Sequence, residues 1–302
     1  MPRFRIHHVN RYRYAQDIGL NYGEARLLPR DTPGQRVLES RLDLEPRGDD
    51  RRDRLDAFGN RVAWFTLRRP HGGLAVIATS LVERLAAAPA QTSPPWEQVA
   101  AHLARPISEG GEAGDDCLLA RECRLASPFV PTDAATLDYA RASFPPARPL
   151  LAAVADLAAR IHADFRYRPD ATRIDTPLSE VLAERHGVCQ DFAHLAIAGL
   201  RGLGLAARYV SGYLETTPPE GQPRLEGADA SHAWIAVYLP GTGWFDFDPT
   251  NGGPTGEGHL TLAWGRDYGD VAPLKGVIYG GGMHSLEVGV TVSRVAEAGH
   301  GA

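Results

Sequence analysis

A cysteine, a histidine and an aspartate in the second half of the chain have the side chains that nucleophilic catalysis requires. They are Cys189, His232 and Asp248, and they lie far apart in the sequence. In such a group a thiolate attacks a carbonyl carbon, an imidazole moves the proton and a carboxylate orients the imidazole. Because the three residues belong to separate elements, they can act together only if the fold brings them to one place.

The residues that follow Cys189 predict a buried helix whose first turn contains the cysteine. Apolar residues recur at helical spacing from 192 to 203, and Gly202 and Gly204 end the pattern. The unpaired N–H groups and the positive dipole at a helix N-terminus favour thiolate over thiol. The backbone N–H of Cys189 could also hold the oxyanion formed during attack on a carbonyl. Taken by itself, this position is more often occupied by a buried structural cysteine.

Two predicted strands carry the histidine and the aspartate. On residues 231–239 the alternate apolar side chains share one face, and His232 lies on the other. On residues 244–248 the same alternation places Asp246 and Asp248 on one face, so either acid could orient the imidazole. Asp248 is better placed for the rim of a cleft because it ends the strand before a proline. A hydrogen-bonded sheet histidine and solvated acids are the alternatives.

Four short motifs surround these residues. They are Cys189-Gln190-Asp191-Phe192-Ala193-His194, Arg208-Tyr209-Val210-Ser211-Gly212-Tyr213, His232-Ala233-Trp234 and Asp248-Pro249-Thr250-Asn251. Together they closely resemble the bacterial transglutaminase-like superfamily, whose members are related to the papain-fold cysteine proteases. The resemblance implies that Cys189 is the nucleophile, His232 the base and Asp248 the orienting acid of a catalytic triad.

The resemblance extends over nearly the whole chain. Residues 26–30, Gln35 and residues 56–60 are similar to the β-rich N-terminal region of one bacterial subfamily, and residues 265–276 are similar to its C-terminal signature. The implied fold class is α+β. An N-terminal antiparallel β-sandwich domain would precede a papain-like transglutaminase core, in which the helix bearing the cysteine packs on an antiparallel sheet.

Patterning along the chain predicts three regions. Residues 1–85 read as a β-rich domain, because β-branched and aromatic residues at 3–14, 37–44, 61–67 and 74–82 are separated by turn residues. Residues 86–145 form a connecting region with one or two short helices. Residues 146–302 form the catalytic core, which ends with a pair of strands around Val277 and residues 286–292.

Composition describes an ordinary globular chain of 302 residues, of which 43% are hydrophobic, with a net charge of −5. This charge and the scattered basic residues argue against nucleic-acid binding. Apolar segments are too short to span a bilayer and the N-terminus shows no secretory signal, so we expect a cytoplasmic protein without a membrane partner. Three cysteines cannot form a disulfide framework in a chain of this length.

Several further residues are weaker candidates. Gln190, Asp191, Trp234 and Trp244 are candidates for the substrate cleft, although core packing explains the two tryptophans equally well. Asp191 and His194 are three residues apart on the predicted helix. They could meet near the cleft, but a helix-surface pair or a buried hydrogen bond is the preferred reading.

We expect neither a metal nor another cofactor. The cysteines Cys117 and Cys123 have no partners at zinc-binding spacing. The histidines His7, His8, His259 and His284 show no spacing of the kind found in zinc hydrolases.

The sequence therefore predicts a cysteine-dependent acyl-transfer enzyme with a peptide or protein substrate. Water as the acceptor would make it a protease or amidase, and an amine would make it a transglutaminase. We favour hydrolysis because water needs no dedicated second site. A non-catalytic peptide-binding scaffold is the alternative of a different class. Resemblance alone also implies an association with peptide ligases of the ATP-grasp type.

Overall fold

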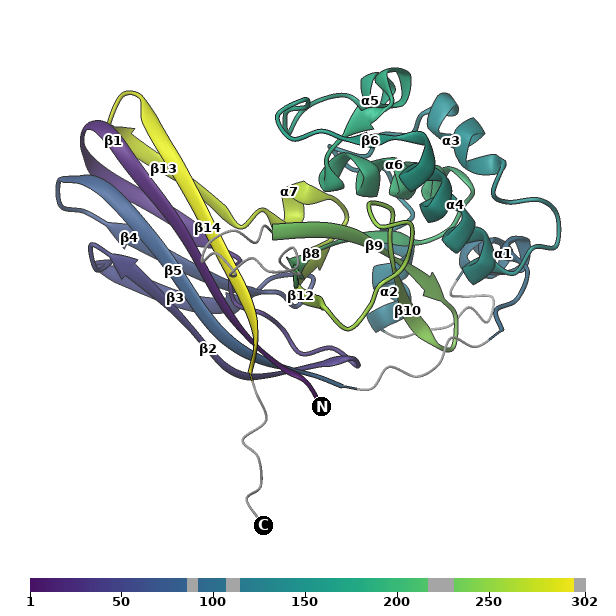
Figure 1. Cartoon of the computed structure of the whole chain (residues 1–302), viewed down its shortest axis with the longest axis horizontal. Coiled ribbons are helices and arrows are strands. Elements are labelled where there is room, and N and C mark those ends of the chain that lie inside the picture. The colour runs from purple at the N-terminus through teal and green to yellow at the C-terminus, as the bar shows by residue number, and fades with distance from the viewer. Residues whose placement is uncertain (86–91, 107–114, 217–230, 296–302) are drawn as a thin grey trace, which may run out of the picture.

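The computed structural model describes residues 1–85, 92–106, 115–216 and 231–295. A curled antiparallel β domain lies beside a core of helices and a second antiparallel sheet (Figure 1). This arrangement confirms the α+β class and the two structural parts expected from the sequence. Within the described ranges, no helix has both the length and the apolar character needed to cross a membrane.

Seven antiparallel strands build the N-terminal domain. They are β1 (Arg3–Ala25), β2 (Gln35–Glu45), β3 (Asp50–Leu55), β4 (Arg61–Leu67), β5 (His71–Arg84), β13 (Leu274–Gly280) and β14 (His284–Val295). The long strand β1 organises the sheet: its first half pairs with β5 and β14, and its second half pairs with β4 and β13. Because every strand is connected through β1, the strands expected to form a sandwich make one continuous sheet that curls.

The two C-terminal strands differ in position from what their place in the sequence suggested. The sequence pattern predicts them as part of the catalytic core, whereas both pair with β1. β14 follows β1 in unbroken antiparallel register from Arg3 to Tyr14. The chain therefore returns to its first strand after completing the core.

The core combines a five-stranded sheet with helices. The sheet has the order β11-β10-β9-β8-β12 and contains β8 (Ala207–Leu214), β9 (Ser231–Leu239), β10 (Gly243–Asp248), β11 (Gly253–Pro254) and β12 (His259–Gly265). A short parallel pair joins β6 (Arg166–Tyr167) and β7 (His186–Gly187). The helices are α1 (Trp96–Ala104), α2 (Asp115–Glu122), α3 (Ala134–Arg141), α4 (Leu150–Asp164), α5 (Leu178–Glu184), α6 (Cys189–Gly202) and α7 (Tyr268–Val271). Three helices thus lie in the connecting region, where one or two were expected.

Helix α6 lies at the centre of the core. Almost every residue after its first turn is buried, and its apolar side chains join those of α4, β8 and β9 in the largest hydrophobic cluster. Gly199 allows α3 to approach closely, because a Cβ atom at this position would lie 2.5 Å from the Cβ of Ala140. Burial on several sides fixes α6 in place, and with it the position of Cys189 at its N-terminus.

Two side-chain amides of the N-terminal domain cover the edge of the core sheet. Gln35 donates to the Thr261 carbonyl at 2.8 Å and accepts from the Thr261 N–H at 2.9 Å. Asn60 makes the same pair of bonds with Trp264, at 2.7 and 2.9 Å. Each amide replaces a neighbouring strand for the edge strand β12. Because of these bonds, the N-terminal domain holds β12 in a defined position.

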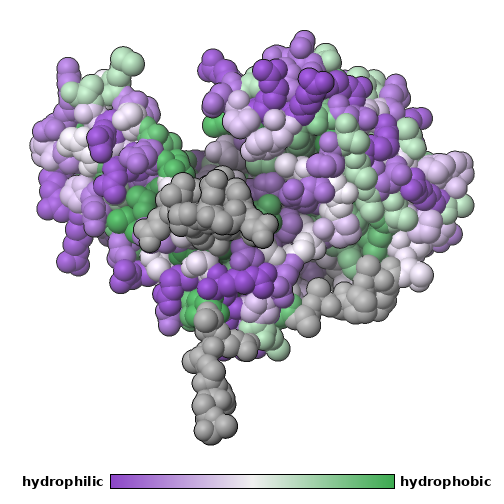
Figure 2. Space-filling model, viewed as in Figure 1, coloured by the Kyte–Doolittle hydropathy of each residue, from purple (hydrophilic) through white to green (hydrophobic). Residues whose placement is uncertain are grey.

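An apolar cluster adds to the contact between the two parts. Its members come from β1, β5 and β14 on one side and from β8 and β12 on the other: Phe4, Ile6, Val82, Val290, Val292, Tyr213, Leu260 and Leu262. The visible surface is largely polar, and apolar side chains gather on the side of the N-terminal domain that faces the core (Figure 2). Exposed apolar residues of this sheet include Val277, Tyr279, Leu286 and Val288.

Gly212 of β8 has no room for a side chain, which leads to a prediction about stability. A Cβ atom there would lie 2.2 Å from the Leu260 carbonyl oxygen and 2.3 Å from the Trp234 ring. We expect Gly212→Ala to lower the free energy of unfolding by about 1–3 kcal/mol, because a strand backbone and an enclosed ring must both move. Urea unfolding measures this change. Gly19→Ala is the matched control, since no atom lies within 4 Å of the Cβ it would add; equal stability of the two variants would contradict the expected clash.

Candidate active site

Cys189 begins α6 and is partly buried. The turn that presents it is closed by Asp191, whose Oδ2 accepts the Val188 N–H at 2.8 Å and the Thr172 hydroxyl at 2.7 Å. Gly187 must be a glycine because a Cβ atom there would lie 2.8 Å from the Asp191 carboxylate. Asp191 therefore shapes the start of the helix, which is the buried hydrogen-bonding role preferred from the sequence.

The structure brings Cys189, His232 and Asp248 together. His232 Nε2 lies 2.7 Å from Asp248 Oδ2, and the Cys189 side chain is close enough to the same imidazole to raise its pKa. His232 is the second residue of β9 and Asp248 is the last residue of β10, so both lie near the ends of their strands. The neighbouring acid, Asp246, accepts instead from the Trp234 indole N–H at 3.3 Å. Of the two aspartates that shared a face in the sequence, only Asp248 bonds His232.

Asp248 is 1% exposed and is surrounded by hydrogen-bond donors. Its Oδ1 accepts the backbone N–H groups of Thr250 at 2.8 Å and Asn251 at 3.2 Å. Its Oδ2 accepts from the Asn251 side chain at 2.6 Å and from His259 Nε2 at 2.9 Å, in addition to His232. Burial acts to raise the pKa of this carboxyl, but the hydrogen bonds outweigh burial and hold the pKa far below its usual range.

The same contacts determine the charge of His232. Burial alone would lower the pKa of this imidazole. Hydrogen bonds and charge interactions with Asp248 and Cys189 exceed that effect and raise the pKa to about 9. His232 is therefore cationic at neutral pH, beside a cysteine at a helix N-terminus. This arrangement suits a thiolate–imidazolium pair, the reactive form of cysteine nucleophiles.

Of the two tryptophan candidates, Trp234 lies within the core and Trp244 is partly buried and packs against it. Trp234 is completely buried, and its ring centre is 6.1 Å from that of His232. Trp244 stacks against the Arg208 guanidinium, with 4.1 Å between the guanidinium carbon and the ring centre. These contacts favour core packing, the alternative that the sequence left open. Trp234 supports the imidazole of His232 from within the sheet.

Gln190 and His194 are engaged elsewhere. Gln190 Nε2 donates to the Ile174 carbonyl at 3.1 Å, which ties the start of α6 to the preceding loop. His194 Nε2 accepts the Tyr268 backbone N–H at 3.1 Å, and its ring stacks on Phe129. Burial lowers the pKa of His194 to about 4, so it is neutral at physiological pH. His194 therefore bonds the segment that begins α7 and does not pair with Asp191.

His259 is the member of this group that the sequence analysis did not identify as part of the site. It is the first residue of β12, the edge strand on the other side of the sheet from β10. The folded sheet nevertheless places it against Asp248. In the sequence, His259 is a candidate only as a metal ligand. Only its position at the start of a strand could have indicated a role in the site, and many other residues occupy such positions.

His232, Asp248 and His259 have the side chains of a possible metal site, because one ligand atom of each lies within 4.8 Å of the others. The orientation of His259 argues against this use. Its Nδ1 accepts the Gly256 backbone N–H at 3.1 Å, so its proton is on Nε2 and points at Asp248. A metal at Nε2 would require that proton to move to Nδ1, where it would face the Gly256 N–H.

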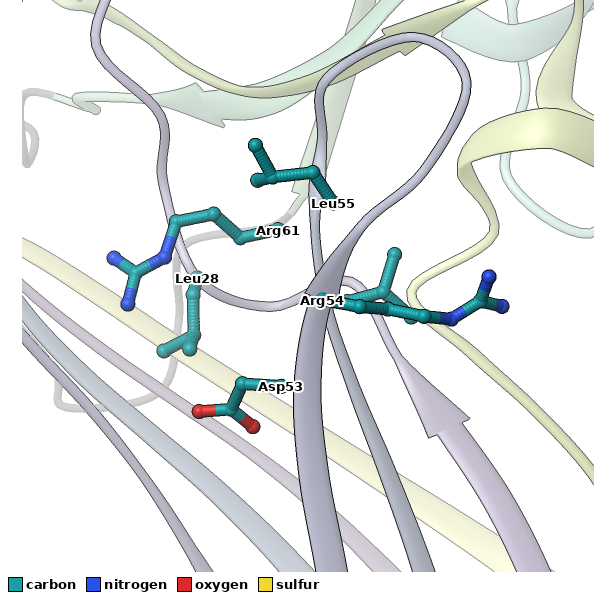
Figure 3. Close-up of a pocket in the computed structure, with 6 residues that line it drawn as sticks. Leu28, Asp53, Arg54, Leu55 and Arg61 are labelled. Carbon is teal, nitrogen blue, oxygen red and sulfur yellow. The ribbon is translucent and has the colours of Figure 1, made fainter.

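A pocket of about 230 Å³ lies away from this site, in the N-terminal domain (Figure 3). It is lined by Leu28, Asp53, Arg54, Leu55, Arg61 and Val62. Asp53 and Arg61 extend toward Leu28, whereas the Arg54 guanidinium points away. This lining contains no nucleophile and none of the triad residues.

The environments of the three cysteines predict different reactivities. Cys117 and Cys123 are buried, and burial raises the pKa of Cys123 to about 11. Cys189 is partly exposed beside a cationic imidazole. We expect iodoacetamide at pH 6–8 to label Cys189 roughly tenfold or more faster than the other two, because the thiolate is the reacting form. Peptide mapping by mass spectrometry measures each rate, with urea-unfolded protein as the control for intrinsic reactivity. Equal labelling of all three in the folded protein would contradict the proposed ion pair.

Comparisons with known proteins agree with this architecture. The bacterial transglutaminase-like N-terminal region matches residues 4–83, and the transglutaminase-like superfamily matches residues 138–249. An uncharacterized protein of Mycobacterium tuberculosis (strain ATCC 25618 / H37Rv) is 40% identical over 296 residues, covering 96% of this chain and 92% of the relative. An uncharacterized protein of Mycobacterium leprae (strain TN) is 32% identical over 300 residues, covering 98% of this chain and 100% of the relative.

A solved structure has the same fold over almost the entire chain. The crystal structure of a protein from Cytophaga hutchinsonii, provisionally described as a cysteine protease, superposes with a TM-score of 0.72 at 21% sequence identity. It covers 98% of this chain and 91% of its own. The chain belongs to the bacterial transglutaminase-like superfamily. The family expected from the sequence motifs is thereby confirmed.

Proposed function

We propose that the protein is a cysteine-dependent enzyme that hydrolyses peptide or amide bonds. The observation that carries the proposal is the 2.7 Å bond between His232 and Asp248, with Cys189 beside the same imidazole. In the first step the Cys189 thiolate attacks the carbonyl carbon, and the His232 imidazolium gives its proton to the leaving amine. This step releases the amine and leaves a thioester on Cys189. Asp248 holds the imidazole in orientation throughout.

The second step regenerates the enzyme. His232, now neutral, takes a proton from water as the oxygen attacks the thioester carbonyl, and the acid product leaves with the thiolate restored. The first turn of α6 supports both steps, because its N–H groups lack helical partners and can bind the developing oxyanion. The burial of Asp248 and His232 keeps this machinery away from bulk water, which strengthens each charge interaction.

Transfer to an amine is the alternative outcome of the same thioester. An amine acceptor would make the protein a transglutaminase, and the triad would be the same. We favour water because it requires no second binding site. The provisional description of the Cytophaga hutchinsonii protein as a cysteine protease agrees with this preference.

The substrate and the setting are also part of the proposal. We infer a peptide or protein substrate, since the thiol lies on a partly exposed helix start. All three cysteines are free thiols, which suits a reducing compartment such as the cytoplasm. An ATP-grasp-type peptide ligase, whose product such an enzyme could process, is the partner suggested by the resemblance of the motifs.

Incubation with a peptide library tests the reaction and its acceptor. The purified protein is incubated with and without a primary amine, and the products are identified by mass spectrometry. Free carboxylic acids in both samples are expected for hydrolysis, and amine adducts would show transfer. The Cys189→Ala protein is the control for contaminating proteases. Products that form equally with the control would refute cysteine-dependent catalysis.

A further inference from the structure

Two histidines share one oxygen of Asp248. His232 Nε2 and His259 Nε2 lie 2.7 and 2.9 Å from Oδ2. The His259 ring is buried and packs edge-on against the Trp234 ring, with 5.3 Å between ring centres. Because its Nδ1 accepts the Gly256 N–H, both of its nitrogens have assigned partners. His259 is therefore held as an N–H donor directed at the carboxylate.

We propose that His259 is a positioning residue that holds the Asp248 carboxylate in the orientation that binds His232. The proposal rests on the triad of the proposed function. Backbone N–H groups of Thr250 and Asn251 hold Oδ1 and leave Oδ2 to be fixed by other donors. The bonds from His259 and the Asn251 side chain hold Oδ2 and so complete the fixing of the carboxylate. A fixed Oδ2 keeps His232 Nε2 bonded and its other nitrogen toward the thiol.

The strand that carries His259 is itself held by the N-terminal domain. Gln35 pairs with the backbone of Thr261, and Asn60 pairs with the backbone of Trp264. Both contacts lie on β12, a few residues after His259. A continuous series of contacts thus runs from the N-terminal sheet through β12 and His259 to Asp248. The N-terminal domain, which lacks triad residues, thereby contributes to the alignment of the triad.

Three substitutions of His259 distinguish the effect of losing its hydrogen bond from the effect of losing the volume of its ring. His259→Leu fills similar space without a donor. His259→Asn can still accept from Gly256 but is too short to reach Asp248. His259→Gln retains a longer amide whose N–H group can reach the carboxylate. We therefore expect the leucine and asparagine variants to behave alike and the glutamine variant to resemble the unmodified protein.

The alkylation of Cys189 reports on the triad without a known substrate. Iodoacetate is an anion and is attracted by the His232 imidazolium, whereas iodoacetamide is neutral. For the unmodified protein the iodoacetate rate should decline as the pH rises through about 9, where His232 loses its proton. In His259→Leu and His259→Asn we expect this decline at lower pH and a roughly tenfold slower iodoacetate reaction at pH 7. Peptide mapping by mass spectrometry gives the rates, and circular dichroism establishes folding.

The outcomes distinguish this proposal from the proposed function. If His232→Ala slows iodoacetate labelling but folded His259→Leu and His259→Asn match the unmodified protein at every pH, the positioning role is overturned and the triad stands. If His232→Ala has no effect on labelling, the triad itself is refuted. If the leucine variant fails to fold, the comparison of asparagine with glutamine decides. Equal losses in these two variants would indicate a purely structural residue and would also overturn the proposal.

Discussion

Replacing Cys189 or His232 by alanine should remove almost all amide hydrolysis, and the double variant should be no slower than either single variant. The two residues act as one unit, because the thiolate depends on the adjacent imidazolium. The expected loss of kcat is about 10⁴-fold to 10⁶-fold for each variant, in line with nucleophile–base pairs generally. The measurement uses the library peptide that the unmodified protein hydrolyses fastest.

Folding and cellular function complete this test. Cys189 is only partly buried, so Cys189→Ala should change the free energy of unfolding little. If both single variants are folded but fail to complement a deletion strain, catalysis is the biological role. Full complementation by both variants would instead support the peptide-binding scaffold.

Asp248→Asn should lower kcat by about 10⁴-fold, the scale found when an orienting aspartate is replaced by its amide. An asparagine removes the negative charge that raises the pKa of His232, so this pKa should fall below about 9. Its amide N–H₂ would also face the His232 and His259 N–H donors. The pH dependence of kcat/KM on the same peptide, together with iodoacetate labelling, measures both effects.

Asp246→Asn is the matched control for this substitution. Asp246 accepts from Trp234 and makes no bond to His232, and an amide oxygen can preserve that contact. We expect a loss of less than about tenfold, since only an indirect support of the imidazole changes. A larger loss at Asp246 than at Asp248 would mean that the other aspartate orients the base.

The stability of Asp248→Asn should also depend on pH in a different way. The pKa of Asp248 is lowered on folding, so its ionised form stabilises the fold above its unfolded-state pKa, near 4. This stabilisation is lost as the pH falls through the still lower pKa of the folded state. The unmodified protein should therefore lose stability between neutral pH and pH 3 more steeply than Asp248→Asn in urea unfolding.

The helix of the nucleophile was predictable because its signals are local. The apolar spacing after Cys189 and the glycines that end it predicted a buried helix, and α6 begins at Cys189 and ends at Gly202. Alternation likewise predicted that His232 lies on the face of its strand away from the apolar set. It could not choose between Asp246 and Asp248, because both share one face. That choice follows from the turn after β10, which directs the Asp248 carboxylate to His232.

The supporting residues of the site were beyond sequence reasoning. From the sequence, Trp234 could equally line the cleft or pack in the core. Its complete burial follows from the packing of distant elements. His259 lies on β12, which joins the sheet beside β8 and not beside β10. Its contact with Asp248 therefore depends on the closure of the whole sheet, for which no local pattern exists.

The sequence by itself determined the chemical groups and several elements of this protein: strands of both sheets, the helix that begins at Cys189, and a cysteine, a histidine and acids able to form a triad. Periodicity and turn residues carry that information because they act between near neighbours in the chain. Only the tertiary structure decided that β13 and β14 pair with β1, that Asp248 bonds His232, and that His259 joins them. These contacts link residues distant in sequence, and they depend on which surfaces are buried together when the chain folds.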